Sequence, residues 1–598
     1  MLDLIQQLCY AKSANSGVQI FLTLIQVFMA IPCSVLSSQM WPEDYGEIAL
    51  KEGLQKYSFI VVGSGSAGAI VASRLSEVKN WTVLLLEAGG DPPIESDIPG
   101  EFFAMMRSQV DWKFYDNSSL VCKSKFRPEC TLPRGKMLGG SSSMNYMIYF
   151  RGTKEDFNEW ADLGNIGWDY ESVLPYFKKS EGNQNETIVA YQNERYHNAN
   201  GPVKISSGTA SEYHEAVIDA LVKNGFDYVS DLNADKETGF TLLQSTSAEG
   251  HRSSTAKAFL APAKNRKNLH IIKNAFVDKI LLNSKNEAYG VEFTYKGKHK
   301  MQAFAEKEVI VSAGAIQSPT LLMRSGIGPR SHLEERNVSC KVDLPVGKNY
   351  IDHVFVFLNY AVNFSSLASP ISQNSESRST PVLFLSGRTD ITNGTGSPDI
   401  QLYYIPLPRG TSSSISNINT PLKSKKELLQ ENDVLFIVIS LNKPKGRGKI
   451  ELDECVTCES PIIHTNHLSD PRDRAKILRA IKQQVNLLKT EPFKKLEPKY
   501  IRIPIEECDE IEFSSDLYWE CMMNYTSLRG QHQVGTSKMG TDSTSVVDPR
   551  CKVHNVQKLR QIDAGVIPVP INANTNAVSM MVGEKGAEMI KEDYGITK

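Results

Sequence analysis

Two short apolar runs flank a helix-like segment near residue 60. Residues 57–62 (YSFIVV) and 81–87 (WTVLLLE) are almost continuously apolar over the length of a strand, as is typical of strands buried on both faces of a parallel sheet. Residues 67–77 (AGAIVASRLSE) lie between them and place apolar side chains at helical spacing. The order strand, helix, strand predicts a β-α-β unit.

Glycines occupy the turn between the first strand and the helix. Gly63, Gly65 and Gly68 have the G-x-G-x-x-G spacing of a dinucleotide-binding loop, in which Ser66 also lies. The first glycine allows a tight turn, the second lets the backbone approach a pyrophosphate, and the third lets the helix pack on the strand. Glu87 ends the second strand, where an acid accepts hydrogen bonds from ribose hydroxyls. This context predicts a dinucleotide site but does not separate NAD from FAD.

The rest of the pattern is interleaved. From residue 146 the sequence becomes irregular, and residues 181–203 are polar enough to predict a surface loop. Strand-like segments resume at 268–282 and 307–328, whereas residues 360–430 are rich in Ser, Thr and Asn. We find no internal repeat. We therefore expect an α/β fold in which one domain is assembled from several chain segments and a second domain is inserted between them.

Composition adds the class of protein. A chain of 598 residues is too long for one ordinary core. The apolar content of 41% and the charged content of 22% are typical of globular proteins rather than disordered ones. The net charge of −2 provides no basic surface, which argues against nucleic acid as a partner.

An uncharged apolar segment lies near the N-terminus. Residues 18–36 are interrupted by Pro32, and the only basic residue before them is Lys12. The clean apolar core of this segment is about as long as the apolar region of a signal peptide and short for a membrane span. We expect residues 1–36 to be a cleaved leader, the mature protein to be secreted, and no stable membrane insertion after the leader is removed. A retained anchor and an uncleaved cytosolic segment are the alternatives.

Glycosylation sequons and cysteines also favour secretion. Some sequons arise by chance in any long chain, but an even number of cysteines outside the leader is typical of a disulfide framework. Sequons occur at Asn80, Asn117, Asn185, Asn337, Asn363, Asn393 and Asn524. The expected disulfides are Cys122–Cys130, Cys508–Cys521 and, by elimination, Cys340–Cys551.

Cys455 and Cys458 precede His464 and His467 in the order C-x2-C-x5-H-x2-H. Four such residues could bind zinc, but the spacer between the pairs is much shorter than the dozen or so residues of a zinc finger. A disulfide between the two cysteines, or unpaired loop cysteines, is the preferred interpretation, and no metal site is predicted.

Five separated segments resemble the signatures of one family. They are PRGKMLGGSSSMNYMIYFRG (133–152), GAIQSPTLLMRSGIG (314–328), LPVGKNYIDH (344–353), HQVGTSKMG (532–540) and IDAGVIPVPINANTNAVSMMVGEKGAEMI (562–590). Together with the glycine loop they resemble the glucose–methanol–choline (GMC) family of FAD-dependent oxidoreductases, in the same order, from Tyr57 to Ile590. The cysteine-bracketed loop before residue 133 and the leader resemble the insect branch, which includes glucose dehydrogenase-like and ecdysone oxidase-like proteins.

The resemblance implies a Rossmann-like FAD domain of the glutathione-reductase type and an interleaved α+β substrate domain with an antiparallel sheet. The expected FAD domain comprises residues 55–145, 245–350 and 525–598, and the expected substrate domain comprises 146–244 and 351–524. The implied reaction is hydride transfer from a small-molecule alcohol to flavin N5, followed by reoxidation by a quinone or O2.

The resemblance also assigns the site residues. Gly63, Gly65, Ser66, Gly68 and Glu87 would bind the ADP half of the cofactor. The pyrophosphate, adenine and flavin would be contacted by Gly139, Gly140, Ser141, Asn145, Val277, Asp563, Ala564 and Asn576. Met144 stands where some members attach FAD covalently to a histidine, so FAD is expected to be non-covalent.

Alcohol oxidation by hydride transfer needs a base, because removal of the hydroxyl proton makes the hydride easier to expel. His532 occupies the position of the family's catalytic histidine, and Asn574 occupies that of its partner, which orients the substrate oxygen. His251, His353 and His554 are expected to be structural. The alternatives to an alcohol dehydrogenase or oxidase are a flavin-bearing hydroxynitrile lyase and a non-catalytic flavin-binding paralogue.

Overall fold

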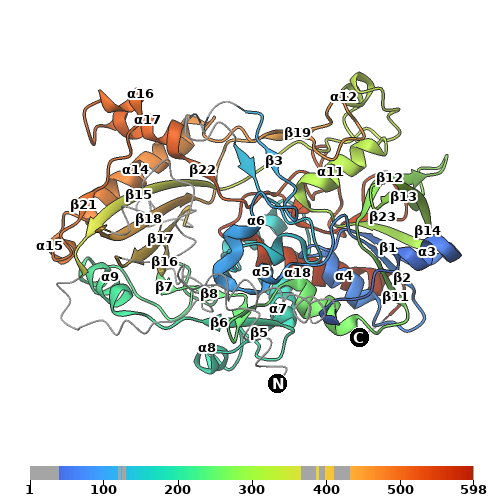
Figure 1. Cartoon of the computed structure of the whole chain (residues 1–598), viewed down its shortest axis with the longest axis horizontal. Helices are drawn as coiled ribbons and strands as arrows, with labels where there is room; N and C mark the ends of the chain where they lie inside the picture. Colours follow the sequence, from blue (N-terminus) through green and yellow to red (C-terminus); the bar gives the residue numbers. More distant parts are fainter. Residues whose placement is uncertain are drawn as a thin grey trace, which may run out of the picture.

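Two β-sheets lie toward opposite ends of the long axis of the molecule (Figure 1). This computed structural model describes residues 39–596, except 119–120, 122, 124–129, 365–384, 390–397 and 410–430. One sheet, called the mixed sheet below, contains parallel and antiparallel pairs, and the other, called the antiparallel sheet, contains only antiparallel pairs. This architecture confirms the predicted α/β class with a second, antiparallel sheet. The domain boundaries stay a prediction.

The mixed sheet has the order β11-β2-β1-β14-β13-β12, with β23 also paired to β14. Its strands are β1 (Tyr57–Val62), β2 (Val83–Leu86), β11 (Leu269–Ile272), β12 (Ala275–Leu282), β13 (Ala288–Tyr295), β14 (His299–Val311) and β23 (Leu559–Gln561). Every residue of β1 and β2 is buried, as their apolar runs predict. β14 serves two pairings, because residues 299–304 pair antiparallel with β13 and residues 305–311 pair parallel with β1.

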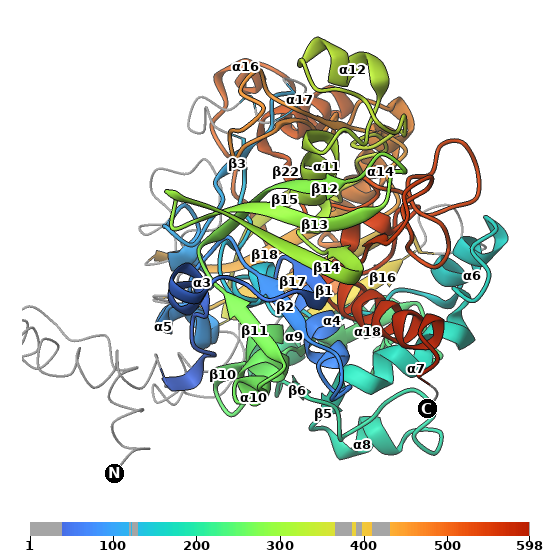
Figure 2. The ribbon, with the colours of Figure 1, turned by 90° about the vertical axis from the view of Figure 1, so that its right-hand side faces the viewer.

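Helices pack against the strands that flank the glycine loop. The predicted β-α-β unit is present, with α4 (Gly68–Leu75) between β1 and β2. The C-terminal helix α18 (Thr575–Asp593) contacts both α4 and α7 (Tyr170–Ser180), and the three helices lie together below β12, β13 and β14 in Figure 2. Because α11 (Gly314–Arg324) follows β14 directly, its N-terminus lies at the same sheet edge as the glycine loop.

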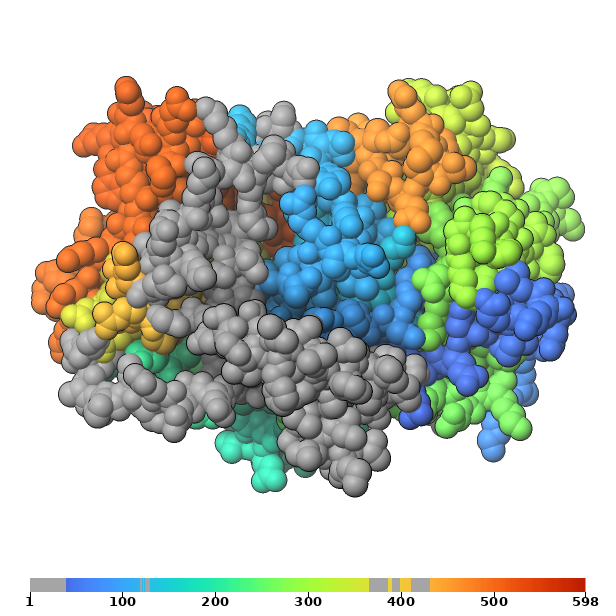
Figure 3. Space-filling model, in the orientation of Figure 1, coloured from blue at the N-terminus to red at the C-terminus, as the bar shows by residue number. Residues whose placement is uncertain are grey.

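The antiparallel sheet has the order β21-β15-β18-β17-β16-β7, with β22 also paired to β15. Its strands are β7 (Gly239–Leu242), β15 (Val354–Val362), β16 (Leu385–Thr389), β17 (Ile400–Leu407), β18 (Asp433–Leu441), β21 (Lys499–Tyr500) and β22 (Leu528–Arg529). One face packs against α9 (Glu212–Lys223), α14 (Pro471–Leu487) and α17 (Asp516–Thr526) and forms a core with them. The other face belongs to a separate apolar cluster that includes Phe102, Phe103 and Met105 of the 3-10 helix η1 (Pro99–Met105). The stretch around residues 90–150, drawn in blue, occupies the middle of one face of the molecule (Figure 3).

The prediction of a surface loop for residues 181–203 is wrong near both ends of this range. Glu181 begins the buried strand β5 (Glu181–Asn183), and His197 is also buried. Glu181 pairs with Arg151 and accepts a hydrogen bond from His197 Nδ1 (2.9 Å), while His197 Nε2 lies 2.9 Å from Asp231. Polar residues can be buried here because their charges compensate one another.

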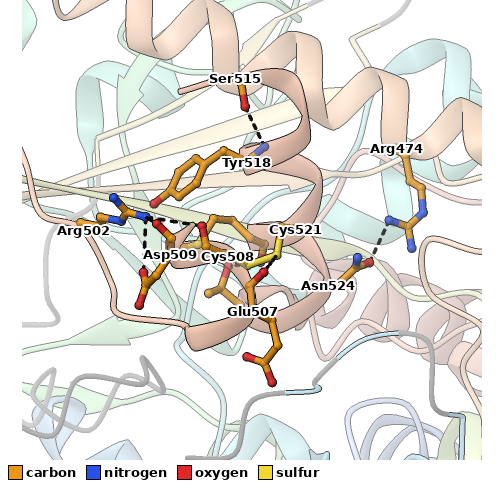
Figure 4. Close-up of a disulfide and its surroundings, with 11 residues drawn as sticks. Arg474, Arg502, Glu507, Cys508, Asp509, Ser515, Tyr518, Cys521 and Asn524 are labelled. Atoms are coloured by element: carbon orange, nitrogen blue, oxygen red, sulfur yellow. Dashed lines mark hydrogen bonds and ion pairs between the residues drawn. A yellow bond between two sulfur atoms is a disulfide. The ribbon is translucent and has the colours of Figure 1, made fainter. Parts of the chain in front are cut away.

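Two disulfides are present in the described part of the chain. Cys508–Cys521 is confirmed and joins α16 (Glu506–Asp509) to α17, with Arg502 donating to the Asp509 carbonyl beside it (2.7 Å, Figure 4). The pairing of Cys340 with Cys551 is wrong, because both thiols are unpaired. The Cys340 thiol contacts the Gly328 carbonyl instead, and Cys551 is fully buried. Cys122, the expected partner of Cys130, lies outside the described residues.

Cys455 and Cys458 form the second disulfide, as one of the two preferred interpretations of this motif predicts. Their sulfurs bond to each other and so cannot act as thiolate ligands. His467 is buried, whereas His464 lies 3.6 Å from Glu451. No cluster of three potential metal ligands occurs in the described part of the chain.

None of the helices described between residues 39 and 596 combines the length and apolarity needed to cross a bilayer. The expected leader, residues 1–36, lies outside the described residues, as does the loop-like run at 365–381.

Candidate functional site

A large cavity opens at the carboxyl edge of the parallel strands, the edge at which α/β sheets bind ligands. It encloses about 1650 Å³, its open mouth included. Thirteen of the fifteen predicted site residues line it: Gly63, Gly65, Ser66, Glu87, Gly140, Ser141, Asn145, Val277, His532, Asp563, Ala564, Asn574 and Asn576. Gly68 and Gly139 are not among the lining residues.

The glycine loop leaves backbone, not side chains, facing the cavity. Gly63 has a φ of +92°, in the left-handed region that favours glycine. A Cβ added at Gly65 would meet nothing within 4 Å, because this residue faces open space. A Cβ at Gly68 would overlap the Gly63 carbonyl oxygen, so that glycine is needed for packing of helix on strand. α4 begins at the end of this loop, and the positive end of a helix dipole favours phosphate oxygens.

The segment after residue 133 forms the facing wall. Gly139 and Gly140 have φ values of +82° and +51° and begin the 3-10 helix η2 (Gly140–Ser143). A Cβ on Gly140 would lie 2.9 Å from the Gly65 Cα, so the two glycine-containing turns approach closely. Asn145 closes this wall, and its Oδ1 accepts a hydrogen bond from Arg252 (2.9 Å).

Two buried carboxylates at the cavity edge are already engaged by the protein. Glu87 accepts hydrogen bonds from the Ser64 N–H (2.9 Å) and hydroxyl (2.6 Å). Asp563 accepts from the Gly314 N–H (2.9 Å) and the Ser318 hydroxyl (2.5 Å). Burial raises the pKa of both carboxyl groups. These carboxylates therefore fix the glycine loop and the start of α11, a role that the sequence reasoning missed.

The remaining residues link the two ends of one continuous cavity. Ser66 Oγ donates to Asn576 Oδ1 (2.7 Å), which ties the glycine loop to the first turn of α18. Val277 of β12 lines the cavity together with Phe276 and Arg324. The groups predicted to bind the ADP half and those predicted to contact the flavin thus share a single space.

His532 and Asn574 meet where the cavity adjoins the antiparallel sheet, which is called the catalytic end below. His532 Nε2 lies 3.2 Å from Asn574 Nδ2, and Asn574 Oδ1 accepts a hydrogen bond from the Tyr403 hydroxyl (3.3 Å). On the other side of the ring, His532 Nδ1 lies 2.9 Å from His353 Nδ1. The hydrogen-bond chain therefore runs His353–His532–Asn574–Tyr403 and reaches β17 of the antiparallel sheet.

These contacts fix the tautomer of His532. The Asn574 amide nitrogen can only donate, so Nε2 of His532 must carry the lone pair. The proton of the neutral ring is then on Nδ1, from which it is donated to His353 Nδ1. The Ile571 backbone lies within hydrogen-bonding reach of the His353 ring and suits a proton on its Nε2. The basic nitrogen of His532 thus faces Asn574 and the cavity.

Burial keeps this histidine pair neutral. It holds the pKa of His532 well below its usual range, with smaller contributions from His353 and Arg134, and it lowers the pKa of His353 to about 4. Burial also raises the pKa of Asp352, which accepts from the His532 backbone N–H (2.7 Å), to about 6. A neutral His532 is the form that can accept a proton.

His353 is the functional candidate that sequence reasoning missed. It was expected to be structural, like His251 and His554, which instead contact Asp97 (2.8 Å) and the Gly540 carbonyl (3.1 Å) and do not line the cavity. The available signal was its position at the end of the motif at 344–353, but nothing in the motif places it beside His532.

The site fits a dinucleotide with a flavin-sized second half. Two glycine-containing turns approach each other where a pyrophosphate would lie, with a helix N-terminus aimed between them. The cavity continues from there to His532. Met144, at the position of possible covalent attachment, also lines the cavity, and a thioether carries no proton to exchange for a bond to flavin.

Comparisons with known proteins agree with this geometry. Residues 57–355 and 444–583 match the N-terminal and C-terminal models of the family described as GMC oxidoreductase. The chain is 36% identical to glucose dehydrogenase [FAD, quinone] of Drosophila pseudoobscura pseudoobscura, over 97% of this chain and 93% of that protein. It is 33% identical to ecdysone oxidase of Bombyx mori, over 99% and 89%. The crystal structure of pyridoxine 4-oxidase from Mesorbium loti superposes with a TM-score of 0.76 at 25% identity, over 90% and 99%.

Proposed function

The chain belongs to the GMC oxidoreductase family and is an FAD-dependent enzyme, and from this premise we propose that it oxidises an alcohol CH–OH group to a carbonyl with His532 as the base. The matches confirm the family and the cofactor predicted from the sequence. The observation that carries the proposal is the orientation of His532, whose unprotonated Nε2 faces Asn574 at the cavity wall.

The residues act on the substrate hydroxyl. When bound, FAD supplies the hydride acceptor, N5 of its isoalloxazine ring. A substrate hydroxyl that replaces the direct hydrogen bond between His532 and Asn574 donates its proton to Nε2 and accepts a hydrogen bond from Nδ2. As the C–H bond breaks, His532 takes the hydroxyl proton and the carbinol becomes a carbonyl, so one hydride and one proton leave the alcohol.

The start of α18 favours the negative charge that develops on the oxygen. Asn574 is the N-cap residue of this 19-residue helix, whose N-terminus faces the cavity. The positive end of a helix dipole stabilises a nearby anion. Neutral His532 and this helix end together assist removal of the proton.

Three finer points belong to the proposal. FAD is bound without a covalent bond, because Met144 stands where a tethering histidine would be. The electron acceptor is a quinone or O2, with a quinone favoured by the likeness to a glucose dehydrogenase named for FAD and quinone. The protein is secreted, which the sequons, the expected leader and the disulfides Cys508–Cys521 and Cys455–Cys458 support.

Anaerobic titration of the purified protein with a panel of alcohols tests the reaction, with bleaching of the flavin absorbance as the readout. His532→Ala should retain FAD while flavin reduction slows by about 10²–10⁴-fold, the contribution expected of a general base. His554→Ala, a histidine outside the cavity, is the control. Near-normal reduction in His532→Ala would remove the base from the mechanism, and acid precipitation should release all the FAD from the wild type.

A further inference from the structure

The face of the antiparallel sheet that looks toward the catalytic end is apolar where it adjoins Asn574. Directly opposed residues of antiparallel strands project from the same face. The register gives two adjoining rows across β15, β18 and β17, of which Tyr403 belongs to the first. The rows are Phe357, Val438, Tyr403 and Asn359, Phe436, Ile405. Five of these six side chains belong to one apolar cluster.

This cluster extends to the cavity wall. Met106, Tyr146 and Ile148 both line the cavity and pack in the same cluster. Phe355 lies two residues before Phe357 and therefore on the same face of β15, and its ring centroid is 6.0 Å from that of His532. The hydroxyl of Tyr403 donates a hydrogen bond to Asn574 Oδ1. The apolar surface therefore begins directly beside the pair that handles the substrate hydroxyl.

Several polar side chains described at this end bind one another. Arg134 donates to Gln531 (3.4 Å) and Gln533 donates to Asp352 (3.1 Å), while Gln533 Oε1 is buried without a partner. Among the described residues that line the cavity, the carboxylates are Glu87 and Asp563, both already bonded to the protein. A polyol or a cationic alcohol would find few groups here to replace its hydration.

We propose that the substrate is an alcohol carried on an apolar framework, which packs against Met106, Tyr146 and Ile148 while its carbinol faces His532 and Asn574. This inference rests on the proposed function, since it concerns the same site. Affinity and rate for such a substrate come from removal of apolar surface from water, whereas a sugar would leave hydroxyl groups without partners.

A homologous series of primary alcohols from propanol to octanol tests the inference on the FAD-loaded enzyme. Each alcohol offers the same carbinol and differs only in apolar length. The kcat/KM of anaerobic flavin reduction should rise by up to about fourfold per methylene, which corresponds to about 0.8 kcal/mol of transfer free energy, until the chain outgrows the wall. Glucose and glycerol should reduce the flavin more slowly than octanol.

A matched pair of variants locates the effect. Ile148→Thr places a hydroxyl on the cavity wall and should lower the ratio of octanol to propanol kcat/KM several-fold. Val110→Thr makes a similar change in the same cluster but away from the cavity, and should leave that ratio unchanged.

The outcomes separate this inference from the proposed function. A flat alcohol series, with glucose or glycerol reducing the flavin at least as well, would overturn the apolar substrate class and leave alcohol oxidation standing. A ratio unaltered by Ile148→Thr would remove this wall from substrate binding. Bound FAD that no alcohol in the panel reduces would overturn the proposed function and this inference with it.

Discussion

His353 should control the rate of alcohol oxidation although it does not touch the cavity. Its Nδ1 accepts a hydrogen bond from the protonated Nδ1 of His532, and the His353 residue is 2% exposed. His353→Leu removes this acceptor and replaces it with an apolar side chain of similar reach. The His532 N–H is then buried without a partner, and the tautomer with its proton on Nε2 becomes competitive, because a rotated Asn574 amide could accept that proton.

The size of the effect follows from the cost of an unsatisfied buried group. That cost is about 1–3 kcal/mol, which corresponds to about a 5- to 150-fold loss if it falls on the reactive tautomer. His353→Asn is the matched variant, because its Oδ1 can take the place of the imidazole Nδ1 and accept the same proton. Both variants lose the contact with Ile571, so the difference between them isolates the hydrogen bond to His532.

The assay is anaerobic stopped-flow reduction of the flavin at saturating alcohol, with FAD content measured from the absorbance of the same samples. We expect full FAD content in both variants, a rate reduced within the stated range in His353→Leu, and substantial recovery in His353→Asn. Equal rates in wild type and His353→Leu would refute the assigned role of the hydrogen bond. Equally slow Leu and Asn variants would assign the loss to packing instead.

Three further predictions concern the cofactor loop, pH and a disulfide. Gly65→Val should abolish FAD retention without lowering the apoprotein Tm, because the valine side chain would enter the open cavity. Gly68→Val should instead lower the Tm, because its side chain would collide with the Gly63 carbonyl. Identical behaviour of the two variants would contradict the assigned roles. Burial holds the pKa of His532 well below 6.5, so the rate of flavin reduction should be independent of pH from about 9 down to 6.5. The rate should fall only at lower pH, where the base becomes protonated. A pH–rate profile whose acid limb is centred at or above 6.5 would count against a buried neutral base. Cys508→Ser with Cys521→Ser should cost about 3 kcal/mol of unfolding free energy for a 13-residue separation, measured by denaturant titration, and unchanged stability would show that α16 and α17 are held by packing alone.

The cofactor site could be predicted from the sequence because its chemistry constrains the backbone. Gly63 needs a positive φ, Gly65 must leave space, and Gly68 must allow close packing, so each leaves a mark in the sequence at fixed spacing. The buried strands around them are equally predictable, because β1 and β2 are apolar on both faces. The roles assigned to the site residues stay predictions, but their convergence on one cavity is what such local rules would produce.

Long-range polar partnerships could not be predicted in this way. Glu181 and His197 look like loop residues until Arg151 and Asp231, distant in sequence, compensate them in the core. The even number of cysteines predicts a disulfide between Cys340 and Cys551 by elimination, yet neither residue is in a disulfide. Each of these outcomes depends on which segments the fold brings together, and that information is not contained in any single segment.

The catalytic end depends on both sheets, because its hydrogen-bond chain joins residues from different parts of the fold. His532 and Asn574 lie in the C-terminal segments that complete the mixed-sheet side, whereas Tyr403 projects from β17 of the antiparallel sheet. Tyr403 therefore has two neighbours of consequence: through its hydroxyl it orients the Asn574 amide, and through its ring it belongs to the apolar row that adjoins the cavity. A substrate framework that packs as proposed contacts the apolar cluster to which the Tyr403 ring belongs, and the Tyr403 hydroxyl sets the direction of the Asn574 amide. Under the two proposals, recognition of the apolar framework and orientation of the base are coupled through this one side chain.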